Sequence, residues 1–502
     1  MQRSFTFVLL IVVCFVVLAA PVLAQEDMSF PLAGRGPYDV SQRRLEFTDA
    51  SRDDRPVNIV LWYPAVVPSE LADELTRAVR AHLPIADLAP NLEGGPYPLV
   101  LYSHDYGGTP TEFRSVLEPL VSHGFVVAGI DHRGTTSAMS YVDRPLDALF
   151  TLDQLEALNE DPQSDLAGLI DLEKVGAMGL GSGAYTTTAL SGARIDPQAA
   201  SDFAEWIEPL IVGYSIFPDW SWSGIENYHD QFAGTESDGL WTATTDPGTQ
   251  AVIAYQPCGI DLFGARGVAE AAVPTLIVGG TQDIACDAEF GAGLLANQLT
   301  GAEHQLVLLN SAHGPPLTGG TVAPDLVLQL VHAFLGMHLQ GEAENAVYLT
   351  EAYANTLDQV EWGIGDFMAV DPANIRDFTF SEGGSIGLGE SVAGIVETAG
   401  DRIGYDLSLA EGNLLNLTAH GTGRRTDSPI FSQFDPVLYI LNDQGEVVFW
   451  SDELSLADNF SGNLDAGFES LDLPAGDYTL VVGGFRMAGP YELTVEEARP
   501  AA

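Results

Sequence analysis

The sequence predicts an α/β domain, with a mainly parallel sheet covered by helices on both faces, followed by an all-β sandwich. At 502 residues the chain is too long for one ordinary core, which favours two domains. Between about residues 99 and 339, short continuous apolar runs alternate with helical patterns, as expected of strands buried on both faces. After about residue 389 the pattern becomes short alternating runs separated by Gly, Asp and Asn turns.

The α/β domain is expected to span residues 30–365 and to begin with a hairpin made by 43–48 and 57–63. The apolar runs that follow are 99–103, 125–130, 174–178, 210–217, 249–255, 274–280 and 305–309. The helical patterns cover 69–82, 112–123, 144–158, 184–190 and 323–339. Because parallel strands bring their carboxyl ends to one edge of a sheet, the loops after these strands are where a ligand is expected.

The second domain is expected to span residues 389–498, with 366–388 as the linker. Its alternating runs are 391–396, 403–409, 414–419, 436–441, 446–450, 476–483 and 491–495. Even spacing of short strands with turn residues between them is typical of an antiparallel sandwich.

Charge excludes several classes of partner. Seventy acidic residues stand against 20 basic ones, which gives a formal net charge of −50. Such a protein repels phosphate backbones and anionic lipid surfaces, so nucleic-acid binding and electrostatic membrane binding are not expected. The composition favours a soluble, secreted protein.

The first residues have the pattern of a signal peptide. Arg3 precedes an apolar run at 5–20, and the small residue Ala24 stands at a suitable cleavage point. We therefore expect residues 1–24 to be removed, the mature protein to be extracellular, and no membrane span to remain. The alternative is an uncleaved membrane anchor, for which the apolar run is short.

Removal of the leader takes Cys14 with it and leaves Cys258 and Cys286. In an oxidising compartment an isolated cysteine pair is a candidate disulfide, expected here to lie over the ligand pocket. The alternative is two small buried thiols.

The stretch 174–185 has the strand–turn–helix pattern of a nucleophile elbow, which normally reads Gly-x-Ser-x-Gly. Its glycines allow a strained turn in which neighbouring Cβ atoms would collide. When Gly179 and Gly183 are aligned with that pattern, Gly181 falls at the nucleophile position and Ser182 is one residue late. Ser182 is thus either a displaced nucleophile or an unrelated serine beside a lost one.

Two further residues complete a candidate catalytic triad with Ser182. Asp283 follows the strand at 274–280, and His313 follows the strand at 305–309, both at the ligand-binding edge. Nucleophile, acid and histidine occur in this order in acyl-transfer enzymes of such a fold. The candidate oxyanion donors are the backbone N–H groups of Ser182 and Tyr106, although the charge of Asp105 is unfavourable there.

Several motifs resemble those of the α/β-hydrolases grouped with platelet-activating-factor acetylhydrolase and bacterial dienelactone-hydrolase-like proteins. They are Gly36-Pro-Tyr, Trp62-Tyr-Pro64, Ser103-His-x-Tyr-Gly-Gly108, His123-Gly-Phe-Val-Val127, Asp131-His132, Arg144-Pro-Leu-Asp147 and the elbow region. The resemblance covers about 36–339 and implies hydrolysis of a small ester or lipid-like ligand without a metal or organic cofactor. Its histidine falls on His313 and its acid on Asp283, or on Gln256 in the acetylhydrolase branch.

The chain departs from the family at two places. The family has Gly-His-Ser-x-Gly at the elbow, where this chain has Leu180, Gly181 and then Ser182. It also has His-Gly in the oxyanion loop, where Asp105 replaces the glycine.

The last domain is similar to bacterial pre-peptidase C-terminal domains, which implies contact with a polymer or a cell surface. The match rests on 391–395, 401–407, 434–440, 443–445 and 473–480. Oxygen ligands for Ca²⁺ are available from Asp435, Asp443, Asp452 and Asp458, unless these are ordinary turn residues.

Three functions follow from these observations. The first is a hydrolase-fold protein with impaired or lost catalysis, because Gly181 replaces the elbow serine. The second is an active serine esterase or lipase-like enzyme that uses Ser182 with His313 and Asp283, for which Ser182 Oγ should lie about 3 Å from His313 Nε2. The third is a protein that binds a surface or polymer through its last domain; direct activation of water by His313 is a further alternative.

Overall fold

The computed structural model describes most of the chain. The described residues are 30–132, 137–204, 221–232, 234–283, 285–286, 288–316, 322–357, 360–362, 380–397, 401–422, 436–445, 447–451, 466–484 and 489–498. The expected leader at 1–24 and the apolar run at 210–217 lie outside them. Among the described residues, no helix combines the length and apolar composition needed to cross a bilayer.

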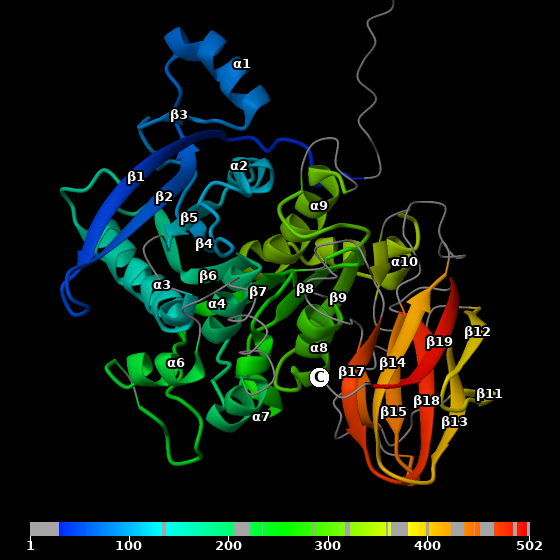
Figure 1. Cartoon of the computed structure of the whole chain (residues 1–502). Coiled ribbons are helices and arrows are strands. Elements are labelled where there is room, and N and C mark those ends of the chain that lie inside the picture. Colours follow the sequence, from blue (N-terminus) through cyan, green and yellow to red (C-terminus); the bar gives the residue numbers. More distant parts are fainter. Residues whose placement is uncertain are drawn as a thin grey trace, which may run out of the picture.

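Strands and helices alternate through the N-terminal domain (Figure 1). Its strands are β1 (Asp39–Asp49), β2 (Arg55–Ala65), β3 (Ile85–Ala86), β4 (Tyr97–Ser103), β5 (Val126–Asp131), β6 (Ile170–Leu180), β7 (Thr249–Tyr255), β8 (Thr275–Gly280), β9 (His304–Leu309) and β10 (Val360–Trp362). Its α-helices are α1 (Ala72–Ala81), α2 (Arg114–Ser122), α3 (Ser137–Glu160), α4 (Ser182–Leu190), α6 (Trp222–His229), α7 (Gly264–Val268), α8 (Leu294–Gln298), α9 (Pro324–Leu335) and α10 (Glu351–Ala354). Short 3-10 turns are η1 (Ser69–Leu71), η2 (Ile260–Leu262) and η5 (Ala343–Tyr348), and π turns are η3 (Glu289–Gly293) and η4 (Gly336–Gln340).

In the described residues these strands form one 10-stranded sheet in the order β10-β9-β8-β7-β6-β4-β5-β2-β1-β3. The six central strands, from β9 to β5, are parallel. The hairpin β1–β2 continues the sheet antiparallel to β5, and β10 adds an antiparallel strand at the opposite side. The parallel sheet and the edge hairpin expected from the sequence are therefore confirmed.

Alternate residues of the central strands divide the core into two faces. On β4, Val100 and Tyr102 pack in the cluster that contains α2 and α9, whereas Leu99 and Leu101 pack in the cluster that contains α3. Helix α4 packs against β6 and β7 through a third cluster that includes Ala184 and Ala254. Because side chains of a strand alternate between faces, this division explains why the strands are apolar throughout.

Some boundaries differ from the sequence prediction. The helix expected at 144–158 begins at Ser137, so Pro145 lies inside it rather than near its start. The strand expected at 174–178 extends back to Ile170, because Tyr97 and Pro98 pair with this earlier segment before the register shifts.

A buried ion network ties the hairpin to α3. Asp147 is fully buried, and its carboxylate contacts Arg52 at 2.8 Å and Arg55 at 2.8 Å. Asp143 pairs with the same two arginines, at 3.5 Å and 3.2 Å. Burial raises the pKa of Asp147, but its hydrogen bonds with Arg55 and His132 outweigh this and hold the pKa well below its ordinary value. The hairpin is thus anchored to α3 by buried ion pairs that solvent does not reach.

The C-terminal region is an all-β sandwich. Its strands are β11 (Ser381–Ser385), β12 (Glu390–Val396), β13 (Arg402–Leu409), β14 (Asn413–Gly421), β15 (Pro436–Leu441), β16 (Val447–Ser451), β17 (Ala466–Leu473), β18 (Gly476–Gly484) and β19 (Gly489–Glu497). They form one sheet in the order β11-β13-β18-β15-β16 and another in the order β12-β19-β14-β17. The two sheets share one core, in which the hydroxyls of Tyr405 and Tyr491 meet at 2.8 Å.

The expected linker at 366–388 needs correction, because β11 lies within it and pairs with β13. Strand β17 was also missed, since its Gly, Glu, Ser and Asp residues have the composition of a turn. Of the four aspartates considered for Ca²⁺, only Asp443 lies in the described residues, at an exposed turn; Asp435, Asp452 and Asp458 lie outside them.

We predict that Asp147→Asn lowers the free energy of unfolding of the N-terminal domain by about 3 kcal/mol, because it removes the buried charge that Arg52 and Arg55 share at 2.8 Å and leaves only part of their compensation, from Asp49 and Asp143. The matched control is Asp165→Asn, whose carboxylate is 60% exposed in its pair with Arg43 and should contribute less than about 1 kcal/mol. Urea unfolding of both variants measures the difference, and equal effects would contradict the burial argument.

Candidate active site

The elbow after β6 has the backbone expected at a nucleophile position. Gly181 adopts φ 56° and ψ −117°, a conformation that L-residues rarely adopt, and α4 begins directly after it. The neighbouring glycines are required by close packing. A Cβ on Gly183 would lie 1.9 Å from the carbonyl oxygen of Ser103, and one on Gly179 would lie 2.0 Å from that of Gly183. The strand–turn–helix geometry is therefore complete, but its central residue carries no side chain.

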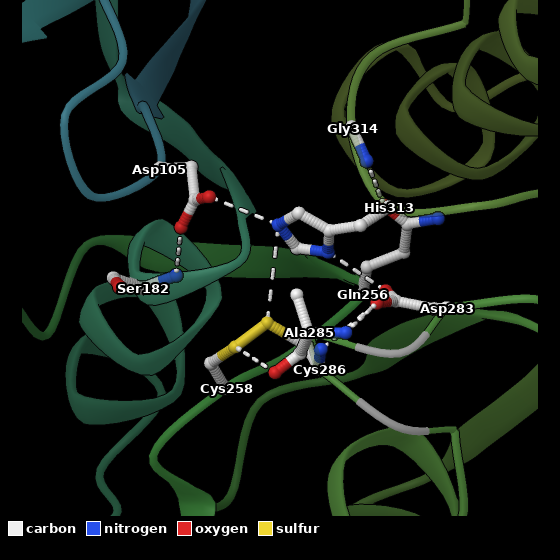
Figure 2. The surroundings of a disulfide bond; sticks show 9 residues. All are labelled: Asp105, Ser182, Gln256, Cys258, Asp283, Ala285, Cys286, His313 and Gly314. Carbon is white, nitrogen blue, oxygen red and sulfur yellow. Dashed lines mark hydrogen bonds and ion pairs between the residues drawn. A yellow bond between two sulfur atoms is a disulfide. The ribbon is translucent and has the colours of Figure 1, made fainter. Parts of the chain in front are cut away.

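The carboxylate of Asp105 occupies the space beside Gly181 where a side chain would lie. Figure 2 shows this carboxylate between the backbone nitrogen of Ser182 and the ring of His313. A Cβ built on Gly181 would lie 2.1 Å from Asp105 Oδ1 and 2.4 Å from Asp105 Cγ. The backbone N–H of Ser182 donates to Asp105 Oδ1 at 2.8 Å, and His313 Nε2 donates to Asp105 Oδ2 at 2.9 Å. Asp105 and a side chain at position 181 are thus mutually exclusive in this arrangement.

His313 lies between two carboxylates. Its Nδ1 donates to Asp283 Oδ2 at 2.7 Å, opposite the bond from Nε2 to Asp105. Asp283 has a fully buried side chain, and its other oxygen accepts from the backbone N–H groups of Ala285 at 2.9 Å and Cys286 at 2.8 Å. Asp283 is therefore placed to orient His313, as the sequence predicts of the acid.

The two carboxylates keep His313 charged. Burial lowers the His313 pKa, but the hydrogen bonds to Asp105 and Asp283 outweigh it and raise the pKa from 6.5 to about 10. Burial likewise raises the pKa of Asp105, and its bonds from His313 and from the Ser182 and Tyr106 N–H groups outweigh this and lower it. At neutral pH His313 is an imidazolium with both nitrogens protonated, so it has no lone pair with which to act as a base.

The expected contact between Ser182 and His313 is absent from the described structure. Ser182 takes part through its backbone N–H, and its hydroxyl forms no hydrogen bond with His313. The two predicted oxyanion donors, the N–H groups of Ser182 and Tyr106, both face the carboxylate of Asp105. The oxyanion position is therefore already filled by a negative group of the chain itself.

Buried groups fix the loop that carries Asp105. The guanidinium of Arg144 donates to the carbonyl oxygens of His104 and Asp105. His104 donates from Nδ1 to the Asp105 carbonyl at 2.7 Å, and Glu112 accepts the Asp105 N–H at 2.9 Å. Burial, followed by the nearby His132 and Arg144, lowers the His104 pKa to about 3, so His104 stays neutral. These contacts fix the backbone of the loop, while Ser182 N–H and His313 hold the Asp105 carboxylate itself.

Gln256, the alternative position for the acid, has a different role. Its Oε1 accepts the N–H of Gly314 at 2.7 Å, and its Nε2 donates to the carbonyl of Ala312 at 2.8 Å. The amide thus holds the backbone on each side of His313 and leaves the imidazole to Asp283.

Cys258 and Cys286 are placed as a disulfide between the loops after β7 and β8, with a Cα–Cα distance of 5.0 Å. The separation lies within the range that a disulfide can bridge. Cys286 Sγ lies 3.9 Å from His313 Nε2. Asp283, Cys286 and His313 are close enough together to be compared with a metal site, but with its sulfur paired Cys286 offers no thiolate ligand.

A second serine, histidine and aspartate form a chain of hydrogen bonds inside the domain. Ser103 Oγ lies 3.0 Å from His132 Nε2, and His132 Nδ1 donates to Asp147 at 3.0 Å. These three residues are at most 2% exposed. No substrate reaches them in this conformation, so we assign them to the buried network that anchors the hairpin.

A small aromatic hollow lies among α3, α4 and the segment after α6. Tyr141, Tyr185, His229, Trp241 and Phe263 are among its lining residues. None of the residues around Asp105 and His313 lines it, so it is separate from the candidate active site.

A family model described as platelet-activating factor acetylhydrolase, isoform II, matches residues 73–158 of this chain. The N-terminal domain has the α/β-hydrolase fold. The matched segment runs from α1 to α3 and includes the loop with Asp105, but it ends before the elbow, Asp283 and His313. The match supports a hydrolase fold of the esterase or acetylhydrolase kind.

Sequence reasoning placed Asp283 and His313 on neighbouring loops, and the structure has them 2.7 Å apart, but it missed the contacts of Asp105 with Ser182 and His313. It treated Asp105 only as an unfavourable charge near the oxyanion position. The sequence did contain a sign of this arrangement: relative to the family pattern, a side chain is gained at Asp105 and another is lost at Gly181. Arg144 and His104 were noticed within motifs, but their roles in holding the loop were not.

We predict that Asp105→Asn lowers the His313 pKa by about 1–3 units, because it removes one of two carboxylate partners. Because folding raises the His313 pKa, the protonated ring stabilises the folded state. This contribution is complete below pH 6.5 and is lost as the pH rises toward about 10. The loss of stability over this range should therefore be smaller in the variant. NMR titration of the His313 ring measures the pKa, and an unchanged value would show that Asp105 is not its charge partner.

We predict that the chain from residue 25 onward has no free thiol when it is denatured without reductant. Closing a loop with a sequence separation of 28 should contribute about 3–4 kcal/mol, so reductant should lower the free energy of unfolding by that amount. Thiol titration under denaturing conditions is the measurement, and two reactive thiols would contradict the pairing of Cys258 with Cys286.

Proposed function

We propose that this protein descends from esterase-like α/β-hydrolases and has lost serine-dependent ester hydrolysis. One observation carries the proposal: the Asp105 carboxylate fills the nucleophile and oxyanion positions together, bonded to Ser182 N–H at 2.8 Å and to His313 at 2.9 Å. A substrate ester would have to displace this charge pair before its carbonyl oxygen reached the N–H donors. While this charge pair is intact, the His313 imidazolium can neither deprotonate a serine nor activate water.

The second candidate is an active esterase that uses Ser182 with His313 and Asp283. It requires Asp105 to leave the site and the turn at Gly181 to rearrange, since a misplacement of about 1 Å already costs about 100-fold in rate. Its support is the intact pair of Asp283 and His313, at 2.7 Å. Direct activation of water by His313 also requires the departure of Asp105, because it needs a neutral ring.

Three further predictions are independent of the catalytic question. Export through residues 1–24 rests on the leader pattern alone. Contact of the sandwich with a polymer or cell surface, and Ca²⁺ binding there, rest on the resemblance to pre-peptidase C-terminal domains. We retain them as proposals.

The test is hydrolysis of p-nitrophenyl acetate by the wild type, Ser182→Ala, Gly181→Ser, and Asp105→Gly combined with Gly181→Ser. The first three should remain at background, because a new side chain at position 181 alone meets the Asp105 carboxylate. The double variant frees both the space and the imidazole, and it should exceed the wild type by at least about 100-fold.

Adding His313→Gln to the double variant is the matched control and should abolish the gain. Wild-type hydrolysis that is lost in Ser182→Ala would instead establish the displaced serine and overturn the proposal. Wild-type hydrolysis that survives Ser182→Ala and requires His313 would establish direct activation of water.

A further inference from the structure

We infer that the Asp105 carboxylate is itself a nucleophile and that the site hydrolyses epoxides, with His313 giving and taking the protons. The inference deepens the proposed function, because it rests on the loss of the serine route. Aspartate carboxylates serve as covalent nucleophiles in several kinds of enzyme. Here the carboxylate is delivered from the loop after β4 to the place beside Gly181 where the elbow side chain would lie.

The geometry gives the two carboxylate oxygens different roles. Oδ1 accepts from Ser182 N–H, one of the two N–H donors that face the carboxylate, and Oδ2 faces His313. The Asp105 side chain is 22% exposed and that of His313 is 19% exposed, so a small molecule can reach both from solvent. Arg144 and Glu112 hold the Asp105 backbone, which preorganises the attacking group.

The chemistry of a carboxylate selects the electrophile. If Asp105 attacked an ester carbonyl, the tetrahedral intermediate would expel the carboxylate, which is a far better leaving group than an alkoxide. At a saturated ring carbon the same attack breaks a strained C–O bond and leaves a stable alkyl ester. The site is therefore suited to an epoxide and poorly suited to an ester.

In the first step Asp105 Oδ2 forms a bond to one ring carbon while the bond from that carbon to the ring oxygen breaks. The ring oxygen leaves with the electron pair and takes the proton from His313 Nε2. The products are an alkyl ester on Asp105, a hydroxyl on the neighbouring carbon, and a neutral His313. The imidazolium, which prevents serine chemistry, here supplies the proton that ring opening needs.

In the second step water attacks Cγ of the ester. Esterification removes the charge of Asp105, so the His313 pKa falls and the neutral ring accepts a proton from the attacking water. The negative oxygen that develops is Oδ1, and Ser182 N–H is already bonded to it. Collapse breaks the Cγ–Oδ2 bond, His313 returns its proton to the departing oxygen, and the new carboxyl group protonates His313. The net reaction converts an epoxide and one water molecule into a vicinal diol.

The charge of the chain is consistent with such a substrate. A formal net charge of −50 repels anions, and an epoxide is uncharged. Both the nucleophile and the proton are supplied at the site, so the reaction needs only water besides the substrate.

The test is a single turnover of styrene oxide, and in parallel of epoxyoctane, by excess wild-type protein in heavy-oxygen water. We expect a diol that carries an oxygen from the protein and an Asp105 peptide that gains one heavy oxygen atom. A diol whose new oxygen comes from the solvent, with no label on Asp105, would overturn the nucleophile. Failure of the wild type to turn over either epoxide would overturn the assigned substrate class.

Variants sharpen the assignment. Asp105→Asn should lower turnover by at least about 100-fold and form no adduct, whereas His313→Gln should accumulate the alkyl ester, visible as an added mass on the Asp105 peptide. Asp73→Asn, the same substitution at an exposed position on α1, is the matched control and should match the wild type. An Asp105→Asn variant that folds and retains wild-type turnover would overturn the inference.

Failure here is distinguishable from failure of the proposed function. If the double variant at Asp105 and Gly181 gains esterase activity but the wild type forms no Asp105 ester, only the epoxide inference fails. If the wild type hydrolyses p-nitrophenyl acetate through Ser182, the proposed function fails and the inference fails with it.

Discussion

The Asp105 carboxylate can lie against the elbow only because residue 181 has no Cβ. This steric constraint joins two departures from the esterase pattern into one change, since neither side chain has room in the presence of the other. It also determines the electrostatics of the site. A carboxylate at this point accepts from Ser182 N–H and pairs with His313. The His313 ring is therefore a cation, and the oxyanion position is occupied by an anion.

The constraint extends into the fold through the loop after β4. Arg144 on α3 bonds to the carbonyls of His104 and Asp105, and Glu112 accepts the Asp105 N–H. The same helix carries Asp147, which pairs with the hairpin arginines Arg52 and Arg55. One helix therefore anchors the edge of the sheet and holds the backbone of the loop that carries the Asp105 carboxylate.

The sequence predicted the architecture well where one physical rule decides it. Apolar runs that alternate with helical patterns predicted the parallel sheet. The shared edge of its strands predicted that Asp283 and His313 lie close together, and they are 2.7 Å apart. Hydrophobic patterning does not predict a contact that exists only because a neighbouring residue has no side chain. Asp105 and Gly181 are far apart in the chain, and nothing in a linear pattern shows that one fills the space left by the other. Strands β11 and β17 were missed because Gly, Ser and acidic residues also form turns.

The most direct test of this account is the protonation state of His313 in the wild type near neutral pH, measured by nitrogen NMR of the labelled ring. We predict that both ring nitrogens carry a proton, because each donates to a carboxylate, at 2.7 Å and 2.9 Å. Loss of the His313 signals in His313→Gln provides their assignment. A ring with one unprotonated nitrogen near neutral pH would contradict the Asp105–His313 ion pair and restore the case for a serine esterase.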